Sequence, residues 1–172
     1  VYESPKDIPE TMVQASAAAA MAALDLPAAE AETQPAEESF PPERDVTGEP
    51  LKIGVFVCDC GMEIGGIIDV NKIIEAAKTI PDVAVAQTVG YGCSSESMAL
   101  IETAIKENGL NRVVLGGCSP RTHETKFQDL LRRAGLNRYL VEIVNLRDQN
   151  TWAHMNQPDQ ALEKAVKLLK VG

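Results

Sequence analysis

From Leu51 onward, short apolar runs alternate with stretches of helical periodicity, and this alternation limits the possible folds more than any other feature of the chain. β-Branched residues dominate four apolar runs that read as buried strands, at 51–57, 83–89, 112–116 and 139–145. Helix signals between and after them, such as the Asp69 cap and the Asn108-Gly109 stop, predict helices at about 69–80, 95–108, 119–134 and 158–170. Strands that alternate with helices form a parallel sheet with helices on its faces. We therefore predict a three-layer α/β fold, Rossmann or flavodoxin-like, with about four strands.

Four cysteines lie where the predicted strands end. Cys58 and Cys60 close the first strand, Cys93 follows the second and Cys118 follows the third. The carboxyl ends of parallel strands share one edge of the sheet, where open α/β folds bind their ligands. Cys93 and Cys118 also begin strand-to-helix turns, where the helix dipole and free N–H groups stabilise a thiolate. Four thiols at one edge predict a metal or iron–sulfur site.

The spacing of the cysteines leaves several interpretations open. It matches neither a ferredoxin nor a zinc-ribbon pattern, so it does not name the metal. The alternatives are a structural zinc site in a docking domain, small buried thiols without a ligand, and thiol–disulfide exchange by Cys58 and Cys60. Arg121 either offsets the charge of thiolates, helps the helix start to hold an anion, or lies at the surface. His123 and His154 stand alone, and no set of catalytic residues stands out.

The net negative charge of the chain comes entirely from its first fifty residues. Residues 1–50 hold 11 acidic and 2 basic residues, whereas residues 51–172 hold 14 of each. A balanced domain lacks the basic face that nucleic-acid binding requires. The sequence has no signal-peptide pattern and no run of about 18 apolar residues. We therefore expect a cytoplasmic chain without a membrane span, in which a disulfide framework is disfavoured.

Composition divides the chain into three parts. The first part, residues 1–24, contains a predicted helix over residues 5–24, with Asp7 as N-cap, Glu10 completing a capping box and an alanine-rich body. Residues 25–50 are rich in Pro, Glu and Ala without apolar periodicity, which predicts a disordered linker. Residues 51–172 form the predicted α/β domain with the four cysteines.

Several separated segments resemble, in order, the amino-terminal domain of the heterodisulfide reductase A family over about residues 51–170: IGVFVCDCG, YGCSS, NRVVLGGCSPRTHE, GLNRYLVEIVNLRDQ and WAHMNQPDQALEKA. The resemblance implies an electron-transfer module of an oxidoreductase. In it, a [4Fe–4S] cluster on Cys58, Cys60, Cys93 and Cys118 exchanges electrons with a flavin. It also implies partners among other heterodisulfide reductase-like or hydrogenase subunits, and flavin and ferredoxin-type domains of the same parent chain.

The opening segment resembles a different part of that family. YESPKDIPETMVQASAAAAMAA is similar to the last helix of its flavin-binding domain. This implies that the helix start, at Lys6, Asp7, Ile8 and Pro9, faces FAD in the parent protein. The order departs from the common layout, in which the cysteine domain comes first, and the chain begins at Val1. We therefore expect a piece of a longer chain with two such modules in tandem, carrying no complete active site of its own.

Overall fold

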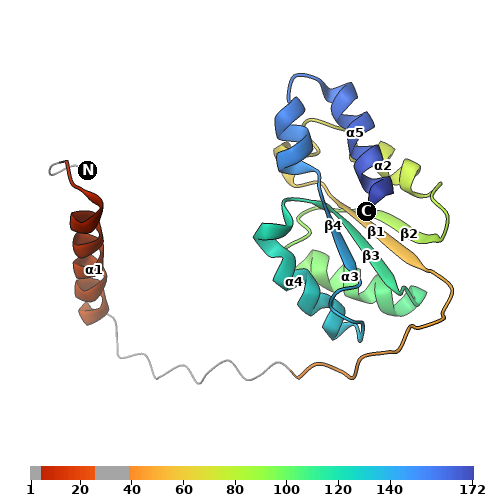
Figure 1. Ribbon diagram of the computed structural model, residues 1–172, viewed down its shortest axis with the longest axis horizontal. Coiled ribbons are helices and arrows are strands. Elements are labelled where there is room, and N and C mark those ends of the chain that lie inside the picture. Colours follow the sequence, from red (N-terminus) through yellow and green to blue (C-terminus); the bar gives the residue numbers. More distant parts are fainter. Residues whose placement is uncertain (1–4, 26–38) are drawn as a thin grey trace. The chain divides into compact units, whose positions relative to one another are not determined.

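The computed structural model of the chain describes residues 5–25 and 39–172 (Figure 1). The chain divides into two compact units, with the boundary between Ser39 and Phe40. The first unit contains helix α1 (Ile8–Asp25), and the second contains all of the strands and the other helices of the described residues. We describe each unit by itself.

Helix α1 begins with the predicted capping box. The backbone N–H of Glu10 donates to the Asp7 carboxylate at 2.8 Å, and the N–H of Asp7 donates to the Glu10 carboxylate at 3.2 Å. These reciprocal bonds satisfy donors that a helix start leaves free. The apolar side chains of α1, among them Ile8, Met12 and Val13, are exposed. Of the helices in the described residues, α1 included, none is both long and apolar enough to cross a bilayer.

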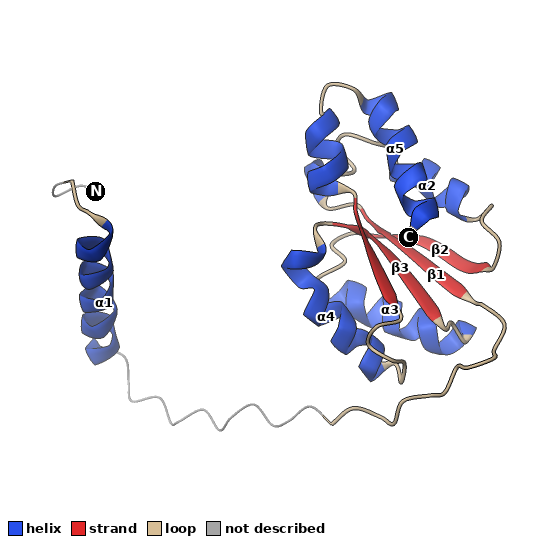
Figure 2. Ribbon diagram, viewed as in Figure 1, coloured by secondary structure: helices blue, strands red, loops and turns tan. Residues whose placement is uncertain are grey.

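The second unit is built around a four-stranded sheet in which every strand runs parallel, in the order β2-β1-β3-β4 (Figure 2). The strands are β1 (Ile53–Cys58), β2 (Val83–Val89), β3 (Arg112–Gly117) and β4 (Val141–Asn145). The helices that follow them in turn are α2 (Val70–Ala77), α3 (Ser95–Asn108), α4 (Pro120–Arg133) and α5 (Pro158–Val171). The predicted α/β class and its four-stranded parallel sheet are confirmed.

The two faces of the sheet supply two separate cores. Val55 points to one face and Phe56 to the other, because side chains alternate along a strand. Val55 packs in a cluster with residues of α2 and α5, including Ile73, whereas Phe56 packs with residues of α3 and α4, including Leu130. Figure 2 shows the two pairs of helices on opposite sides of the sheet. Each of these buried side chains contributes roughly 1.5–3 kcal/mol, so both layers of helices are held firmly to the sheet.

The helix boundaries follow local capping chemistry. The Asp69 carboxylate accepts a hydrogen bond from the N–H of Asn71 at 3.0 Å, and the Ser94 hydroxyl accepts one from the N–H of Ser97 at 3.2 Å. Such caps contribute about 1 kcal/mol each. Helix α3 ends at Gly109, whose φ of 61° lies in the left-handed region that glycine adopts without strain. These ends agree with those that the sequence predicts.

Three short helical turns lie outside the predicted elements. A 3₁₀ turn, η1 (Gly61–Glu63), follows β1, while a π-helical turn, η2 (Arg147–Thr151), and a 3₁₀ turn, η3 (Trp152–His154), connect β4 to α5. Single π-helical turns are rare and are often found at functional sites.

Residues 40–50 contact the α/β unit, although their composition predicts part of a disordered linker. The Phe40 ring lies 3.6 Å from the guanidinium of Arg132. The Arg44 guanidinium donates to the carbonyl of Leu110 at 3.1 Å. The compact unit that contains the sheet begins at Phe40.

Candidate metal centre

The carboxyl ends of β1 and β3 form the switch point of the sheet. From β1 the chain crosses to β2 on one side, and it then returns to β3 on the other side of β1. The helices that follow β1 and β3 pack on opposite faces, so the two connections diverge. Open α/β folds bind ligands in the crevice that this divergence leaves. Val57 pairs with Gly116, so Cys58 and Gly117, the last residues of β1 and β3, lie next to each other at this edge of the sheet.

Cys58 and Cys60 lie on a segment that continues β1 and then reverses. The thiol of Cys58 donates to the carbonyl of Gly90 at 3.3 Å, and its sulfur accepts a hydrogen bond from the N–H of Gly92, also at 3.3 Å. The N–H of Cys60 donates to Gly90 at 2.9 Å, which extends the pairing with the β2 side. The chain then turns at Cys60, whose φ of 47° and ψ of 33° are left-handed. This conformation costs a non-glycine residue roughly 1–2 kcal/mol, so the surrounding contacts must hold it.

Cys93 and Cys118 lie in the turns from β2 into α3 and from β3 into α4. Cys93 directly precedes Ser94, the cap of α3, and Cys118 directly follows Gly117, the last residue of β3. All four cysteines are half-buried with free thiols. All four line a single cavity of about 50 Å³. The structure thus brings together the four residues that the sequence predicts at one edge of the sheet.

Two glycines give the cavity a backbone wall. A methyl group at Gly92 would lie 3.9 Å from the sulfur of Cys58, and one at Gly117 would lie 3.4 Å from its Cβ. Four thiols against such a wall are a donor set that suits an iron–sulfur cluster and, equally, a zinc ion. Within residues 5–25 and 39–172, no group of three or more His, Cys, Asp or Glu side chains is arranged to hold a metal ion. The cysteines line the cavity without forming a closed set of ligands, and their role as metal ligands stays a prediction.

Burial is the main influence on the acidity of these thiols. It raises the pKa of Cys58 to about 11; the N–H of Gly92 opposes this rise, and charge on Cys60 adds to it. Burial also raises the pKa of Cys118, and the guanidinium of Arg147 opposes that rise. Without a cation, Cys58 and Cys118 therefore favour the protonated thiol at neutral pH. Metal binding at this site would release protons.

Arg147 brings positive charge to the cavity. It lies in η2, lines the cavity, and directs its Nη1 to the sulfur of Cys60 at 4.0 Å. Arg121, which the sequence suggests for this role, is exposed and is not part of the cavity lining. Arg147 follows the last residue of β4 by two positions, at the edge that carries the cysteines. The position of Arg147 just after the end of a predicted strand is the sequence feature that could have identified it.

The two histidines differ in their relation to the cavity. His123 is half-buried and lines it, at a point where the backbone of α4 leaves helical geometry with a φ of −138°. The Nδ1 of His154 lies 3.0 Å from the carbonyl of Asn150, and His154 does not line the cavity. His123 is therefore a residue of the site that the sequence alone does not indicate.

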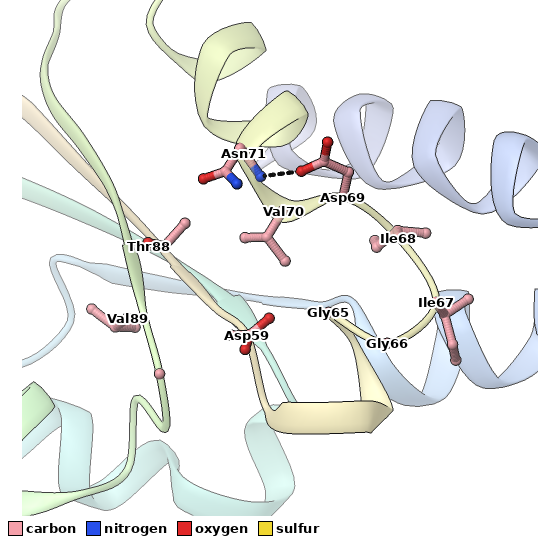
Figure 3. A pocket seen from close by; sticks show the side chains of 11 residues that line it. Asp59, Gly65, Gly66, Ile67, Ile68, Asp69, Val70, Asn71, Thr88 and Val89 are labelled. Carbon is pink, nitrogen blue, oxygen red and sulfur yellow. Dashed lines mark hydrogen bonds between the residues drawn. The ribbon is translucent and has the colours of Figure 1, made fainter.

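The residue between the first two cysteines belongs to a different pocket. Asp59 lines a pocket of about 580 Å³ beside Gly65, Gly66 and the start of α2 (Figure 3). A methyl group at Gly65 would overlap Oδ1 of Asp59, so a larger residue there requires the carboxylate to move. Asp69 also lines this pocket, where it caps the helix through the N–H of Asn71 (Figure 3). The described lining of this pocket has two carboxylates and no cysteine, and it shares Val89 with the thiol cavity.

Comparison with known proteins relates the chain to the A subunits of heterodisulfide reductases. It is 44% identical over 128 residues to the A subunit of the H₂:CoB-CoM heterodisulfide, ferredoxin reductase of Methanothermobacter thermautotrophicus, which covers 74% of the chain and 19% of that relative. It is 43% identical over 123 residues to the second iron–sulfur A subunit of the CoB–CoM heterodisulfide reductase of Methanopyrus kandleri, covering 72% of the chain and 19% of the relative. The chain is homologous to the heterodisulfide reductase A family. No protein-family model matches it.

The homology confirms the resemblance drawn from the sequence segments. The chain spans no more than about a fifth of the length of these relatives. A third relative is the A subunit of the ferredoxin/F420H₂-dependent CoB-CoM heterodisulfide reductase of Methanosarcina acetivorans. It is 43% identical, and the match covers 71% of the chain and 15% of that relative. The relatives from Methanopyrus kandleri and Methanocaldococcus jannaschii are named iron–sulfur subunits. The four cysteines that line the thiol cavity therefore lie in a region homologous to the heterodisulfide reductase A family.

The residues predicted to face a flavin lie in the other compact unit. Lys6 and Asp7 precede α1, while Ile8 and Pro9 form its first turn. The Lys6 ammonium donates to the side-chain oxygen of Gln14, further along the helix. The contact of these residues with FAD stays a prediction.

Proposed function

We propose that the chain is an electron-transfer module of a larger oxidoreductase similar to the heterodisulfide reductase A family, in which Cys58, Cys60, Cys93 and Cys118 hold a [4Fe–4S] cluster. The observation that carries this proposal is the convergence of all four thiols on one cavity at the switch point of the sheet. The iron–sulfur names of two relatives favour a cluster over zinc.

The residues around the cavity suit this role. A bound cluster supplies one-electron transfer, and its potential depends on hydrogen bonds to sulfur and on solvent exposure. The N–H of Gly92 already donates to the sulfur of Cys58, and partial burial of the Cys58 and Cys118 side chains restricts water. Thiols with raised pKa values need a compensating cation to become thiolates, and iron provides it.

The parent protein supplies the remaining parts of the electron path. Helix α1, with Lys6 to Pro9 at its start, is the end of a preceding flavin-binding domain, and FAD belongs to that domain in the parent. Ferredoxin-type domains of the same chain and other heterodisulfide reductase-like or hydrogenase subunits are the electron partners. The small share of the relatives that the chain spans supports a larger parent protein. The assignment of α1 is supported by the resemblance of the segment YESPKDIPETMVQASAAAAMAA to the last helix of the flavin-binding domain.

The decisive experiment is anaerobic reconstitution of the 172-residue chain with iron and sulfide. We expect four iron and four sulfide per chain, broad visible absorption, and an EPR signal on reduction by dithionite. Zinc bound without sulfide in anaerobically purified protein would instead support a structural zinc site. A folded chain that takes up neither iron nor zinc would refute a metal role for the cysteines.

Single substitutions test which residues are ligands. Each Cys→Ser variant should lose most of the cluster iron while keeping the circular dichroism of the wild-type chain. His123→Ala is the matched control, because His123 lines the same cavity but is not one of the proposed ligands. Loss of the cluster in His123→Ala, with retention in one Cys→Ser variant, would replace the four-cysteine set by three cysteines and a histidine.

A further inference from the structure

Arg147 is the sole lysine or arginine among the described residues that line the thiol cavity, and these residues include no carboxylate. Its side chain is 22% exposed, and its Nη1 points to the sulfur of Cys60 at 4.0 Å. Cys118, which follows β3, lines the same cavity as Arg147. Thiols from both sides of the switch point therefore lie in the field of one guanidinium.

The guanidinium is held in place by two neighbours. Its Nε donates to the carboxylate of Asp148 at 3.2 Å, and its central carbon lies 5.0 Å from the centre of the Trp152 ring. Asp148 is itself fixed, because its N–H donates to the side chain of Asn145 at 2.9 Å and its other oxygen accepts from the Asn145 amide at 3.3 Å. Asn145 is the last residue of β4, so the position of Arg147 is set by the sheet.

The same segment is bound to the loop that carries Cys60. The hydroxyl of Thr151, which is fully buried, donates to the carbonyl of Glu63 at 2.7 Å. The indole N–H of Trp152 donates to the Glu63 carboxylate. Glu63 ends η1, three residues after Cys60. The turn that carries the guanidinium and the turn that carries the thiol are therefore joined, which fixes the charge relative to the sulfur.

We propose that Arg147 is a positioning residue that raises the reduction potential of the cluster held by the four cysteines; this rests on the proposed function. An electron added to the cluster makes the site more negative, and a positive charge beside Cys60 stabilises the reduced state more than the oxidised state. Asp148 works in the opposite sense, because its carboxylate offsets part of the guanidinium charge. The π-helical turn η2 serves to present this charge at the edge of the sheet.

The test measures the midpoint potential of the reconstituted full chain by redox titration monitored by EPR. Arg147→Gln should shift the reduction equilibrium at least tenfold toward the oxidised cluster, which is about 59 mV for one electron. Arg147→Lys keeps the charge and should stay within about threefold of wild type. Asp148→Asn should shift the equilibrium in the opposite direction. Arg121→Gln is the matched control, because it removes the same charge from an exposed position outside the cavity, and its potential should equal that of wild type.

The outcomes separate this inference from the proposed function. A wild-type chain that takes up no cluster overturns both. A loaded wild type with an unshifted Arg147→Gln variant, or with equal shifts in Arg147→Gln and Arg121→Gln, overturns the role of Arg147 alone. If Arg147→Gln holds no cluster, Asp148→Asn decides: a higher potential supports the role of the guanidinium, and an unchanged or lower potential overturns it. Thermal unfolding of each variant shows whether its fold is intact.

Discussion

Asn150→Asp should make the stability of the α/β unit depend steeply on pH, because the π-helical turn that carries Arg147 is built on a buried amide. The Asn150 side chain is fully buried, and its Nδ2 donates to the carbonyl of Ala161 at 2.8 Å, which joins η2 to α5. Its Oδ1 is buried without a hydrogen-bond donor in the described part of the chain. Aspartate has nearly the same shape, but only its protonated form can donate to Ala161. The carboxylate would face a carbonyl without any compensating partner.

The size of the effect follows from the burial. Aspartate in the unfolded chain has a pKa of about 3.9, and full burial raises a carboxyl pKa by up to about 3–5 units. Since the pKa of the introduced carboxyl would be higher in the folded than in the unfolded chain, the variant keeps its stability below about pH 4 and loses it as the pH rises. Each pH unit within this window costs about 1.4 kcal/mol. With a folded pKa near 7, the loss at pH 7 is about 4 kcal/mol, a large part of the 5–15 kcal/mol typical of a domain.

Urea unfolding at pH 5, 6 and 7 measures this loss, with fluorescence of Trp152, the single tryptophan of the chain, as the signal. The difference in unfolding free energy between wild type and Asn150→Asp should grow by about 2 kcal/mol from pH 5 to pH 7. Asn150→Ser is the control: its shorter side chain loses the bond to Ala161 at every pH and has no titratable group, so its deficit should not change with pH. An Asn150→Asp deficit that is equal at pH 5 and pH 7 would refute the buried-amide account of this turn.

Two further predictions concern the core and the boundary of the unit. Leu130→Ala, in the fully buried core between the sheet and α4, should lower the unfolding free energy by about 2–5 kcal/mol in urea, whereas Lys126→Ala on the exposed face of the same helix should change it by less than about 0.5 kcal/mol. Removing residues 1–39 should leave the unfolding of the α/β unit unchanged. Removing residues 1–50 should cost about 1–3 kcal/mol, because buried Asn111 loses the carbonyl of Pro50, to which it donates at 2.8 Å; equal stability of the two truncated chains would contradict this.

Local chemistry was sufficient to predict most of the sheet and its helices. The run Val83–Val89 is β-branched and bounded by turn residues, and the observed β2 has the same ends. The cap at Asp69 and the stop at Gly109 depend on residues within a few positions of each helix end, so a single sequence contains the information. The edge that carries the cysteines follows from topology, because parallel strands bring their carboxyl ends together.

Features that depend on distant partners could not be predicted in this way. The segment 40–50 lacks apolar periodicity, yet Phe40 packs on Arg132 and Arg44 reaches Leu110, both far along the chain. The π-helical turn is held by the bonds of Thr151 and Trp152 to Glu63, which no pattern within residues 147–152 reveals. The spacing of the cysteines likewise does not distinguish an iron–sulfur cluster from a zinc ion. That choice depends on the orientation and separation of the four thiols in the folded chain.

The position of each residue of the thiol cavity relative to its strand end predicts the site better than the number of residues between the cysteines. A helix and a strand separate Cys60 from Cys93, and another helix and strand separate Cys93 from Cys118. The number of residues between these cysteines is therefore set by the lengths of the crossovers and not by the ligand. Strand β1 leads into two of the thiols, Cys58 and Cys60, β2 and β3 lead into one thiol each, and β4 leads into Arg147. Every strand of the sheet therefore contributes to the lining of the thiol cavity. The thiols and the guanidinium converge only when all four strands are paired, so formation of the thiol cavity depends on completion of the whole sheet.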